Sequence, residues 1–569
     1  MNTPESAVGR RSATHDVLNQ VPPLAGHDVA DDPALLEAVA REGGDWANGD
    51  IHTLGRLAGQ AGTQEQARLA NEHPPVLRTH DRWGNRIDEV EFHPAWHALM
   101  TTAVSHGLHA APWADPRPGA HVARAAKFYV WSQAEAGHGC PVSMTYASVP
   151  ALRHAPAQAA VLEPLLAARE YQPGLVPPAG KPGLIAGMAM TEKQGGSDVR
   201  ANTTRAEPVP GLGEGAHLIT GHKWFCSAPM SDLFLILAQA HDGLTCFLLP
   251  RVLPDGSRNG MRLQRLKDKL GNRSNASAEV EFDHAVAWQV GEPGRGVATI
   301  IEMVSATRLD CIIGSAAGMR LGAVTAVHHA THRQAFGKDL IAQPLMAGVL
   351  ADIALESQAA TTLAIRLAGA ADRAARGDQA ESALLRIALP ACKYWVCKRA
   401  PAHAAEALEC LGGNGYVEES GMPRLYREAP LNSIWEGSGN VASLDVLRAL
   451  ARSPGAAEAL LAELDLAAGG DARLDGALTA LRDRLAWMAG ATALEAQYGA
   501  RGLAALIAVT LQAALLVRYA PAPVADAFCA SRLGSGGVGG PAAPFGSLPG
   551  GLDLDAILDR ARAAGQRTQ

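Results

Sequence analysis

The chain has 569 residues, and a rough prior of about 100–200 residues per domain predicts three to five domains. Hydrophobic residues make up 47% and charged residues 19%, which is typical of a globular protein with a large core. The net charge of −7 argues against a general attraction to nucleic acid or anionic membranes and leaves open only a local basic patch.

The N-terminus and the cysteines bear on location. The first residues, Met-Asn-Thr-Pro-Glu-Ser, lack the apolar stretch of a secretory signal, and acidic residues come too early for a typical transit peptide. The eight cysteines are irregularly spaced and form no Cys-x-x-Cys pair, which indicates reduced thiols rather than a disulfide framework. A cytoplasmic protein is therefore expected.

Residues 1–182 are predicted to form an N-terminal helical domain with an extension. Residues 1 to about 20 are polar and are expected to be loose. From Pro33 to about Glu170 apolar residues recur at helical spacing, as in Ala120–Ala136, and proline clusters punctuate the pattern.

Residues 183–290 change to short segments rich in β-branched, Leu and Phe residues, separated by turn signals such as Asp242-Gly243. Six such segments in about 100 residues predict a small barrel or sandwich. The predicted strands are His217–Thr220, Lys223–Cys226, Leu233–Gln239, Thr245–Leu249, Met261–Arg265 and Ala278–Phe282.

The helical pattern returns in residues 291–452, which are predicted to form a helical bundle domain. Its long helices are expected at Ala298–Arg333, Pro344–Arg376 and Glu381–Leu411. Residues 453–569 form an extra C-terminal helical domain. Its apolar run at 502–517 is too short to span a bilayer comfortably, so a buried core helix and no membrane association are expected.

This order predicts an α+β fold, because a doubly wound sheet would alternate strands and helices. The glycine pattern Gly534, Gly536 and Gly539 follows no predicted strand, so a flexible loop is favoured over a dinucleotide site. His328 and His332 have metal-like spacing but no third ligand in the sequence, and no metal is expected.

Two segments before and within the predicted strands carry candidate binding groups. In the loop Met190–Asp198, hydroxyl and backbone N–H groups are able to bind a polar ring edge or a phosphate, and two glycines allow close approach. In Lys223–Ser227, two aromatic residues precede a hydroxyl and are able to cover the face of a flat ring. Taken alone, Met190–Asp198 is an ordinary loop, and Lys223–Ser227 is a strand whose two aromatic residues alternate between the core and the surface.

Three further segments lie in the helical half. Arg333–Lys338 ends a predicted helix, and arginine is a natural partner for a pyrophosphate. Leu411–Tyr416 is a glycine turn that, as a bare pattern, is a helix C-cap. Pro423–Glu428 leads directly into the last motif.

The last motif, Ile434–Asn440, places Glu436 between an apolar pair and a run of small residues. Burial beside Trp435 disfavours the charged carboxylate and raises its pKa, as a general base near neutrality requires. From this heptapeptide alone, a helix cap or a salt bridge is the alternative.

In order and approximate spacing, these segments resemble the signature segments of the acyl-CoA dehydrogenase flavoproteins. The resemblance extends to Phe92–His97 and Leu266–Asn275 and is dense over about residues 15–452. It implies an N-terminal helical domain, a central β-barrel and a C-terminal helical bundle, with FAD bound between the barrel and the bundle.

The resemblance also implies roles for residues. Glu436 would remove the α-proton of an acyl thioester, with hydride transfer from the substrate to flavin N5; a short or branched acyl-CoA is the expected substrate. The implied cofactor contacts are Met190, Thr191, Gly196, Ser197, Phe225, Cys226, Ser227, Arg333, Phe336, Gly412, Gly413, Gly415, Trp435, Gly437, Ser438 and Asn440. Arg333, Phe336 and Gly412–Gly415 would reach the FAD of a neighbouring subunit, which implies a homotetramer.

The branch of the family that the chain most resembles is associated with duplex DNA and with alkylation damage, usually through an extra C-terminal domain. Residues 451–569 contain ten arginines and no lysine against eleven acidic residues, which makes a poor DNA surface. Arg518 and Arg532 are the candidate DNA contacts, because no acidic partner lies near them in sequence. A DNA-binding flavoprotein with vestigial dehydrogenase activity is therefore the alternative function.

Overall fold

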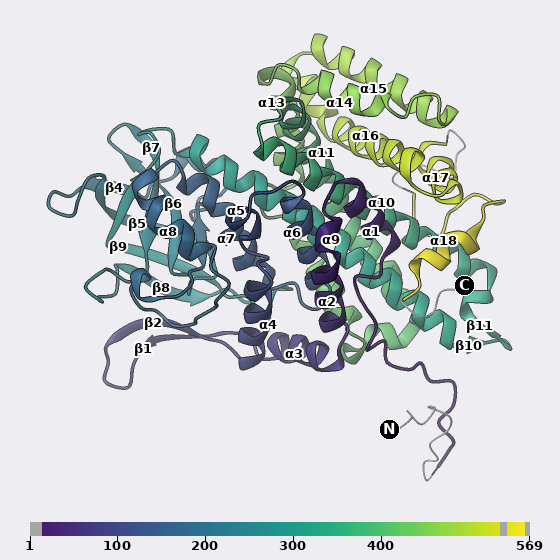
Figure 1. Ribbon diagram of the computed structural model, residues 1–569, viewed down its shortest axis with the longest axis horizontal. Helices are drawn as coiled ribbons and strands as arrows, with labels where there is room; N and C mark the ends of the chain where they lie inside the picture. Colours follow the sequence, from purple (N-terminus) through teal and green to yellow (C-terminus); the bar gives the residue numbers. More distant parts are fainter. Residues whose placement is uncertain (1–13, 535–542, 564–569) are drawn as a thin grey trace.

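A β domain occupies one end of the molecule and a long helical bundle the other, with the N-terminal helices lying against both (Figure 1). The computed structural model describes residues 14–534 and 543–563. The predicted α+β order of helical, β and helical parts is confirmed.

The N-terminal part contains eight helices among the described residues. They are α1 (Pro33–Arg41), α2 (Asn48–Ala58), α3 (Ala61–Glu72), α4 (Pro94–Ser105), α5 (Ala111–Ala114), α6 (Ala120–Ser132), α7 (Gly139–Leu152) and α8 (Pro156–Leu166). Asp32 caps α1 by accepting a hydrogen bond from Ala34 N, and Pro33 occupies the first turn, where its missing N–H costs nothing. α6 and α7 are buried almost all round, because α6 packs between α2 and the bundle and α7 packs between the bundle and the β domain.

The helical prediction for residues 33–170 missed one hairpin, formed by β1 (Val76–His80) and β2 (Arg86–Glu91). Its turn is built by Asp81, whose carboxylate accepts hydrogen bonds from Trp83 N and Asn85 N. Most hairpin residues are exposed or half-buried, so the segment lacks the apolar pattern that would have identified it.

The β domain is a seven-stranded sheet. Its strands are β3 (Ala186–Ala189), β4 (Arg205–Pro208), β5 (Ala216–Ser227), β6 (Leu233–Ala240), β7 (Gly243–Pro250), β8 (Met261–Leu266) and β9 (Ser277–Val290). The strand order is β3-β6-β4-β5-β9-β7, with β8 on β9, and a further β6–β7 pairing gives the sheet its barrel-like form. The six predicted strands are all confirmed, but the first two form the single strand β5, whose pairing with β9 shifts register around Gly221. β3 and β4 were not predicted, because each has only four residues and no β-branched side chain.

Three long helices form the bundle: α9 (Gly296–His332), α10 (Pro344–Ala375) and α11 (Gln379–Glu409). Each agrees with its predicted bounds to within two residues. Asp378 caps α11 through Ala380 N and Glu381 N, and Pro344 opens α10. The shorter helices α12 (Met422–Glu428) and α13 (Gly439–Arg452) complete the bundle and flank the Glu436 motif.

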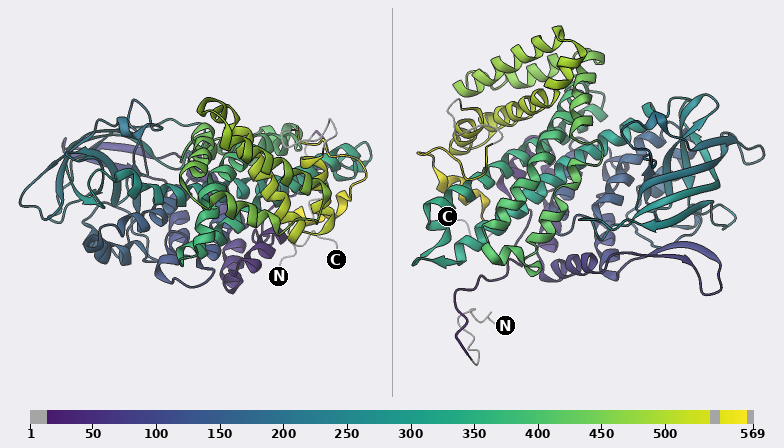
Figure 2. Two further views of the ribbon diagram at one scale, coloured as in Figure 1. Left: turned by 90° about the horizontal axis from the view of Figure 1, so that it is seen from above. Right: turned by 180° about the vertical axis from the view of Figure 1, so that it is seen from behind.

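The C-terminal helices stack on the bundle, away from the β domain (Figure 2). They are α14 (Ala456–Asp465), α15 (Ala472–Gly490), α16 (Ala493–Tyr519), α17 (Ala522–Phe528) and α18 (Leu554–Ala561). Among the described residues, α16 is the one helix long and apolar enough to cross a membrane, yet 72% of its most apolar window is buried inside the protein. This burial agrees with the predicted core helix. Gly536 and Gly539 of the glycine pattern lie outside the described residues.

Candidate active site

Glu436 lies in the short connection between a turn at Leu431–Ser433 and the start of α13. Its backbone φ is 57°, in the left-handed region that disfavours residues with a side chain, and Gly437 follows at 103°. Two consecutive residues with positive φ make a sharp turn. This turn places the Glu436 carboxylate beside the Thr307 hydroxyl on α9.

Two buried cations hold this turn through three successive carbonyls. Lys393 on α11 donates from Nζ to Trp435 O at 2.8 Å and to Gly437 O. Arg308 on α9 donates from Nε to Glu436 O at 2.9 Å, and its Nη1 pairs with Asp445 on α13 at 2.6 Å. Buried N–H groups that bind buried carbonyls compensate both desolvation costs, so the turn is fixed from two helices.

The electrostatic environment of Glu436 suits a base. Its Oε2 is buried and has no hydrogen-bond partner among the described residues. Burial raises the pKa of Glu436, and the Thr307 hydroxyl, Arg308 and Lys393 oppose part of that rise. The predicted upward shift is confirmed in direction. A carboxylate with a raised pKa and a free oxygen is able to accept a proton from a ligand.

The glycine-rich loop 190–198 is tied to β5. Trp224 N donates to Thr191 O at 2.8 Å, and a side chain at Gly196 would lie 2.3 Å from Thr191 Oγ1. Gly196 therefore leaves the Thr191 hydroxyl free of a neighbouring side chain. Ser197 is exposed, and Met190 is half-buried with its carbonyl bound by Asn202.

A buried ion pair under this loop was missed by sequence reasoning. Glu192 is fully buried and binds Lys223 Nζ at 2.9 Å, Thr203 N at 2.7 Å and Thr204 N at 3.1 Å. The two residues are 31 positions apart, so no local pattern in the sequence shows this pairing. The two segments do contain residues of opposite charge, Glu192 and Lys223. If the two segments meet in the fold, burial of these charges requires that they pair.

The end of β5 presents alternating faces. The Phe225 side chain is 52% exposed and offers a flat apolar surface, whereas Cys226 is fully buried in the core of the β domain. A cofactor contact through the Cys226 thiol is therefore excluded, because the two-residue alternation of the strand turns it inward. Ser227 returns to the Phe225 side, with its Oγ 3.2 Å from Ser277 Oγ on β9.

The thiol of Cys140, at the start of α7, connects the β5 end with the Glu436 turn. Burial raises the pKa of Cys140 to about 12, and the Glu436 charge adds to the rise, while Lys269 and hydrogen bonding by Ser227 and Asn275 oppose it. One side chain thus interacts with groups from the β domain, the N-terminal helices and the bundle. Met190 of the glycine-rich loop and Trp435 of the Glu436 motif both pack against the hydrophobic cluster that contains Cys140.

The residues present fit a flavin at this place. A flat ring would find the exposed Phe225 ring, the hydroxyls of Thr191 and Ser227, and the unpartnered Glu436 Oε2. Trp435 binds Asn432 through Nε1 at 3.0 Å, while Ser438 and Asn440 are exposed at the start of α13. These positions are compatible with the predicted contacts.

Arg333, Phe336 and the glycines at 412–415 lie elsewhere on the chain. Phe336 is 99% exposed at the tip of the hairpin β10 (Gln334–Ala335) and β11 (Lys338–Asp339), at the end of the bundle far from the β domain (Figure 1). Arg333 donates to the backbone carbonyl of Asn19, and Gly412 has φ 59°. One chain does not bring these residues to Glu436, so their cofactor role stays a prediction about a second subunit.

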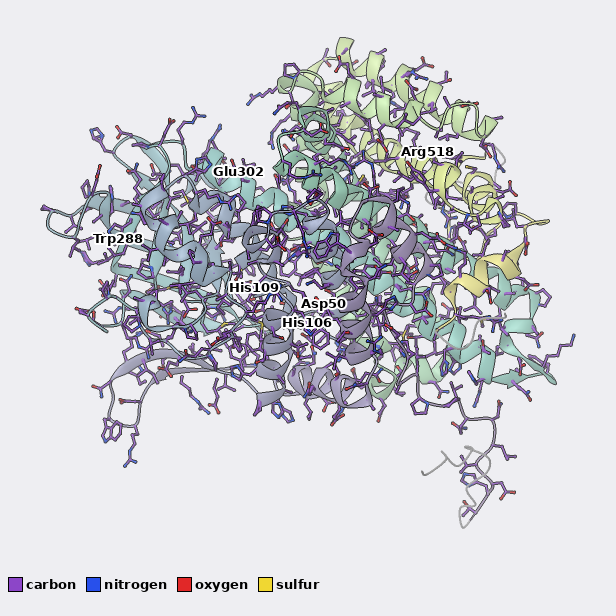
Figure 3. The ribbon with its side chains drawn as sticks, viewed as in Figure 1. Asp50, His106, His109, Trp288, Glu302 and Arg518 are labelled. Atoms are coloured by element: carbon purple, nitrogen blue, oxygen red, sulfur yellow. The ribbon has the colours of Figure 1, made fainter. Side chains whose placement is uncertain are left out.

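The DNA contacts predicted for the C-terminal helices are corrected. Arg532 is only 4% exposed and binds Asp352 at 2.5 Å and Glu356 at 3.0 Å, both on α10. Arg518, on α16 (Figure 3), pairs with Glu463 at 3.1 Å and contacts Tyr519. Both arginines have acidic partners that are distant in sequence. The Arg532 guanidinium is buried and cannot reach a phosphate, whereas the Arg518 side chain is 19% exposed and already paired.

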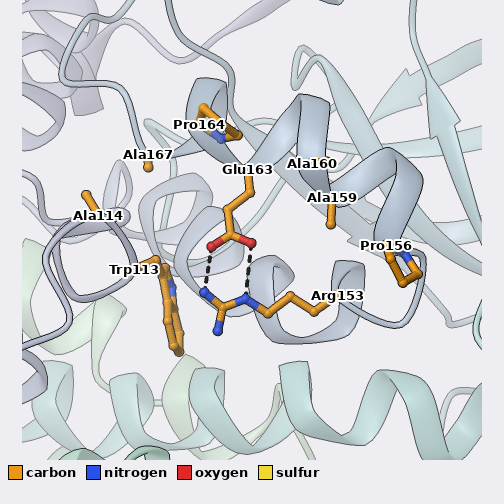
Figure 4. A pocket seen from close by; sticks show the side chains of 9 residues that line it. All are labelled: Trp113, Ala114, Arg153, Pro156, Ala159, Ala160, Glu163, Pro164 and Ala167. Atoms are coloured by element: carbon orange, nitrogen blue, oxygen red, sulfur yellow. Dashed lines mark hydrogen bonds and ion pairs between the residues drawn. The ribbon is translucent and has the colours of Figure 1, made fainter.

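A cavity between α5 and α8 lies away from this site (Figure 4). Its volume is about 530 Å³, and the ion pair of Arg153 with Glu163 crosses it beside Trp113. None of the motif residues lines it. Across residues 14–534 and 543–563, no group of three or more His, Cys, Asp or Glu side chains is arranged to hold a metal ion.

A second carboxylate with a raised pKa, Glu428 on α12, lies against the loop at Asn272 and was not singled out by sequence. Burial and the nearby Glu135 charge raise the pKa of Glu428 to about 7, and its Oε1 accepts from Asn272 N at 2.8 Å. Because the folded pKa exceeds the usual value of about 4.5, Glu428 favours folding below about pH 4.5. This contribution is lost as the pH rises through about 7.

In the native protein the free energy of unfolding should fall between pH 5 and 9, and Glu428→Gln should reduce this fall. At the alkaline end the two free energies of unfolding should differ by about 2 kcal/mol. Glutamine keeps the acceptor for Asn272 N and cannot ionise. Thermal unfolding across this pH range measures the effect. Parallel curves for both proteins would contradict the assignment, and the exposed Glu302→Gln is the control.

Comparison with known proteins adds to this geometry. Residues 19–173 match the model of the adaptive response protein AidB N-terminal domain. Residues 187–285 match the acyl-CoA dehydrogenase middle domain, and residues 294–451 the acyl-CoA dehydrogenase C-terminal domain. AidB of Escherichia coli is 46% identical over 529 residues, covering 92% of this chain and 95% of that protein. The chain belongs to the acyl-CoA dehydrogenase family.

Other members of the acyl-CoA dehydrogenase family agree over most of the chain. Acyl-CoA dehydrogenase family member 11 of Caenorhabditis elegans is 32% identical over 71% of this chain and 65% of its own length. The crystal structure of C. elegans ACDH-11 in complex with C11-CoA has a TM-score of 0.83 and 26% identity, covering 92% of this chain and 94% of that chain. A Bacillus anthracis acyl-CoA dehydrogenase complexed with FAD shares the fold at 18% identity, with a TM-score of 0.63 over 82% of this chain and 83% of that chain.

Proposed function

We propose that the protein is an FAD-dependent acyl-CoA dehydrogenase in which Glu436 removes the α-proton of a short or branched acyl thioester. The observation that carries the proposal is the buried, unpartnered Oε2 of Glu436, whose pKa is raised and whose backbone is held by Lys393 and Arg308. Among the described residues, this oxygen forms no ion pair that would lower its basicity.

Bound FAD supplies the acceptor for the hydride that leaves the β-carbon. Thr191, Phe225 and Ser227 would hold its ring, as they do in the family pattern. Glu436 accepts the α-proton on Oε2, and burial keeps water from competing for the carboxylate. Lys393 and Arg308 orient the base, because a displaced backbone would move the carboxylate away from the α-carbon.

Recombinant protein should therefore bind FAD and be bleached by an acyl-CoA. The experiment is anaerobic titration with short, branched and C11 acyl-CoAs, followed by flavin absorbance near about 450 nm. Bleaching by a short or branched chain alone supports the proposed substrate, and bleaching by C11-CoA alone moves it to longer chains. Protein that fails to bind FAD after supplementation would overturn the proposal.

A homotetramer in the cytoplasm completes the proposal. The exposed Phe336 and the exposed Tyr416 (82%) are large side chains that a partner subunit would cover. All eight cysteines are buried free thiols, which suits a reducing compartment. Light scattering of FAD-loaded and FAD-stripped protein would give the subunit number and its dependence on cofactor.

Duplex DNA binding is the second proposal, supported by the match to the AidB N-terminal domain and to AidB itself. The ion pairs of Arg518 and Arg532 count against these two as contacts, so binding would use another surface. Binding driven by phosphate contacts would weaken linearly in log affinity with log salt. A gel shift absent even at low salt would leave the dehydrogenase proposal alone.

A further inference from the structure

A series of hydrogen bonds leads from Ser227, in the proposed active site, to a lysine in the loop between β8 and β9. Ser227 and Ser277 are directly opposite each other where β5 meets β9, and their hydroxyls are 3.2 Å apart. Lys269 Nζ lies 3.0 Å from Ser277 Oγ. The hydrogen bonds therefore connect Lys269 to Ser277 and Ser277 to Ser227.

The Lys269 ammonium is held in place by the loop that follows β8. It donates to Asn275 O at 2.5 Å and approaches Asn272 Oδ1 at 3.4 Å. Burial lowers the pKa of Lys269 to about 8, and the charges of Glu428 and Glu135 and the Cys140 thiol partly oppose the fall. Lys269 makes no ion pair closer than 4 Å among the described residues, so its charge is not neutralised by direct contact.

The direction of donation follows from the chemistry of the groups. An ammonium donates only, so Ser277 Oγ accepts from Lys269. Ser277 then has its own proton available for Ser227 Oγ. Ser227 Oγ accepts this hydrogen bond, so its own O–H is available to donate, either to a ring atom or to its neighbour the Cys140 thiol, which is a weak acceptor. The lysine thus sets the Ser227 hydroxyl as a donor toward the active site.

We propose that Lys269 is a positioning residue for the flavin ring, which fixes Ser227 as a hydrogen-bond donor through Ser277 and places a positive charge behind it. The inference rests on the proposed FAD site. A ring that takes up a hydride gains two electrons with one proton, so its charge becomes more negative by one. A nearby cation and a directed donor both favour that reduced form over the oxidised form.

Lys269→Met is the principal test, and its readout is the midpoint potential of bound FAD, measured against a reference dye. We expect the reduced flavin to bind about 10-fold more weakly relative to the oxidised flavin, which for a two-electron couple is a fall of about 30 mV. Lys269→Arg should restore most of the potential. Lys398→Met, at an exposed lysine of α11, removes the same charge elsewhere and should leave the potential unchanged.

Ser277→Ala separates the hydroxyl relay from the charge and provides a second variant if Lys269→Met fails to fold. It should lower the potential in the same direction by a smaller amount, while apo-protein binds oxidised FAD within about 3-fold of the native affinity. Unchanged potentials in Lys269→Met, or in Ser277→Ala, with FAD bound would overturn the inference. A native protein that never binds FAD would instead overturn the proposed function.

Discussion

Replacing Glu436 by glutamine should slow the reduction of bound flavin by an acyl-CoA about 10²–10⁴-fold. Glutamine has the shape of the native side chain and leaves the hydrogen bonds of Lys393 and Arg308 intact, because these bind backbone carbonyls. It cannot accept the α-proton. Anaerobic stopped-flow mixing measures the rate, and FAD content should match that of the native protein.

The same experiment has a pH dependence with a defined sign. Because the pKa of Glu436 is raised, the native rate should increase as the pH rises through that pKa, and the variant should lose this dependence. Glu302→Gln is the matched control, since Glu302 is a carboxylate on α9 that is 48% exposed and pairs with His154 (Figure 3). A Glu436 variant that reduces flavin at the native rate would exclude Glu436 as the base.

Replacing Arg532 by methionine should lower the free energy of unfolding by about 3 kcal/mol. The substitution leaves Asp352 and Glu356 in a buried setting without their shared guanidinium, although Arg399 still pairs with Glu356. Arg532 comes from the C-terminal part and both acids from α10, so the loss should loosen the docking of the C-terminal helices on the bundle.

Denaturant unfolding, with proteolysis of the C-terminal helices as a second readout, measures this effect. Arg482→Met is the control, because its ion pair with Asp465 is nearly half exposed on both sides and is worth at most about 1 kcal/mol. Equal effects of the two substitutions would show that the buried network does not anchor this region. Weakened DNA binding by a stably folded Arg532 variant would instead return that residue to the DNA surface.

The long helices and strands were predicted because each is buried along most of its length and therefore carries a long apolar pattern in the sequence. α9, α10 and α11 are surrounded by other helices, and β6 and β7 are buried along nearly their whole length. The hairpin β1–β2 and the four-residue strands escaped detection because their pairing, rather than their own side chains, defines them. Pairing partners far apart in sequence leave no local pattern.

The same limit separates the parts of the site. Recognisable motifs contain Glu436, Thr191, Phe225 and Ser227, so the roles of these residues could be predicted from the sequence. The cations that hold the Glu436 turn, Lys393 and Arg308, occupy ordinary positions within long helices, and only the fold shows which carbonyls they bind. Arg532 illustrates the converse error, since a missing neighbour in sequence says nothing about a neighbour in space.

The left-handed backbone conformation of Glu436 lowers the stability of the fold at a position where the side chain is needed for proton transfer. A glycine would adopt a φ of 57° without steric cost and would remove a carboxylate whose Oε2 is buried without a partner. Glycine at position 436 should therefore be the more stable occupant, even though it cannot accept a proton. Selection for stability alone would drive this site toward inactivity, so the glutamate would persist only where proton transfer is itself under selection.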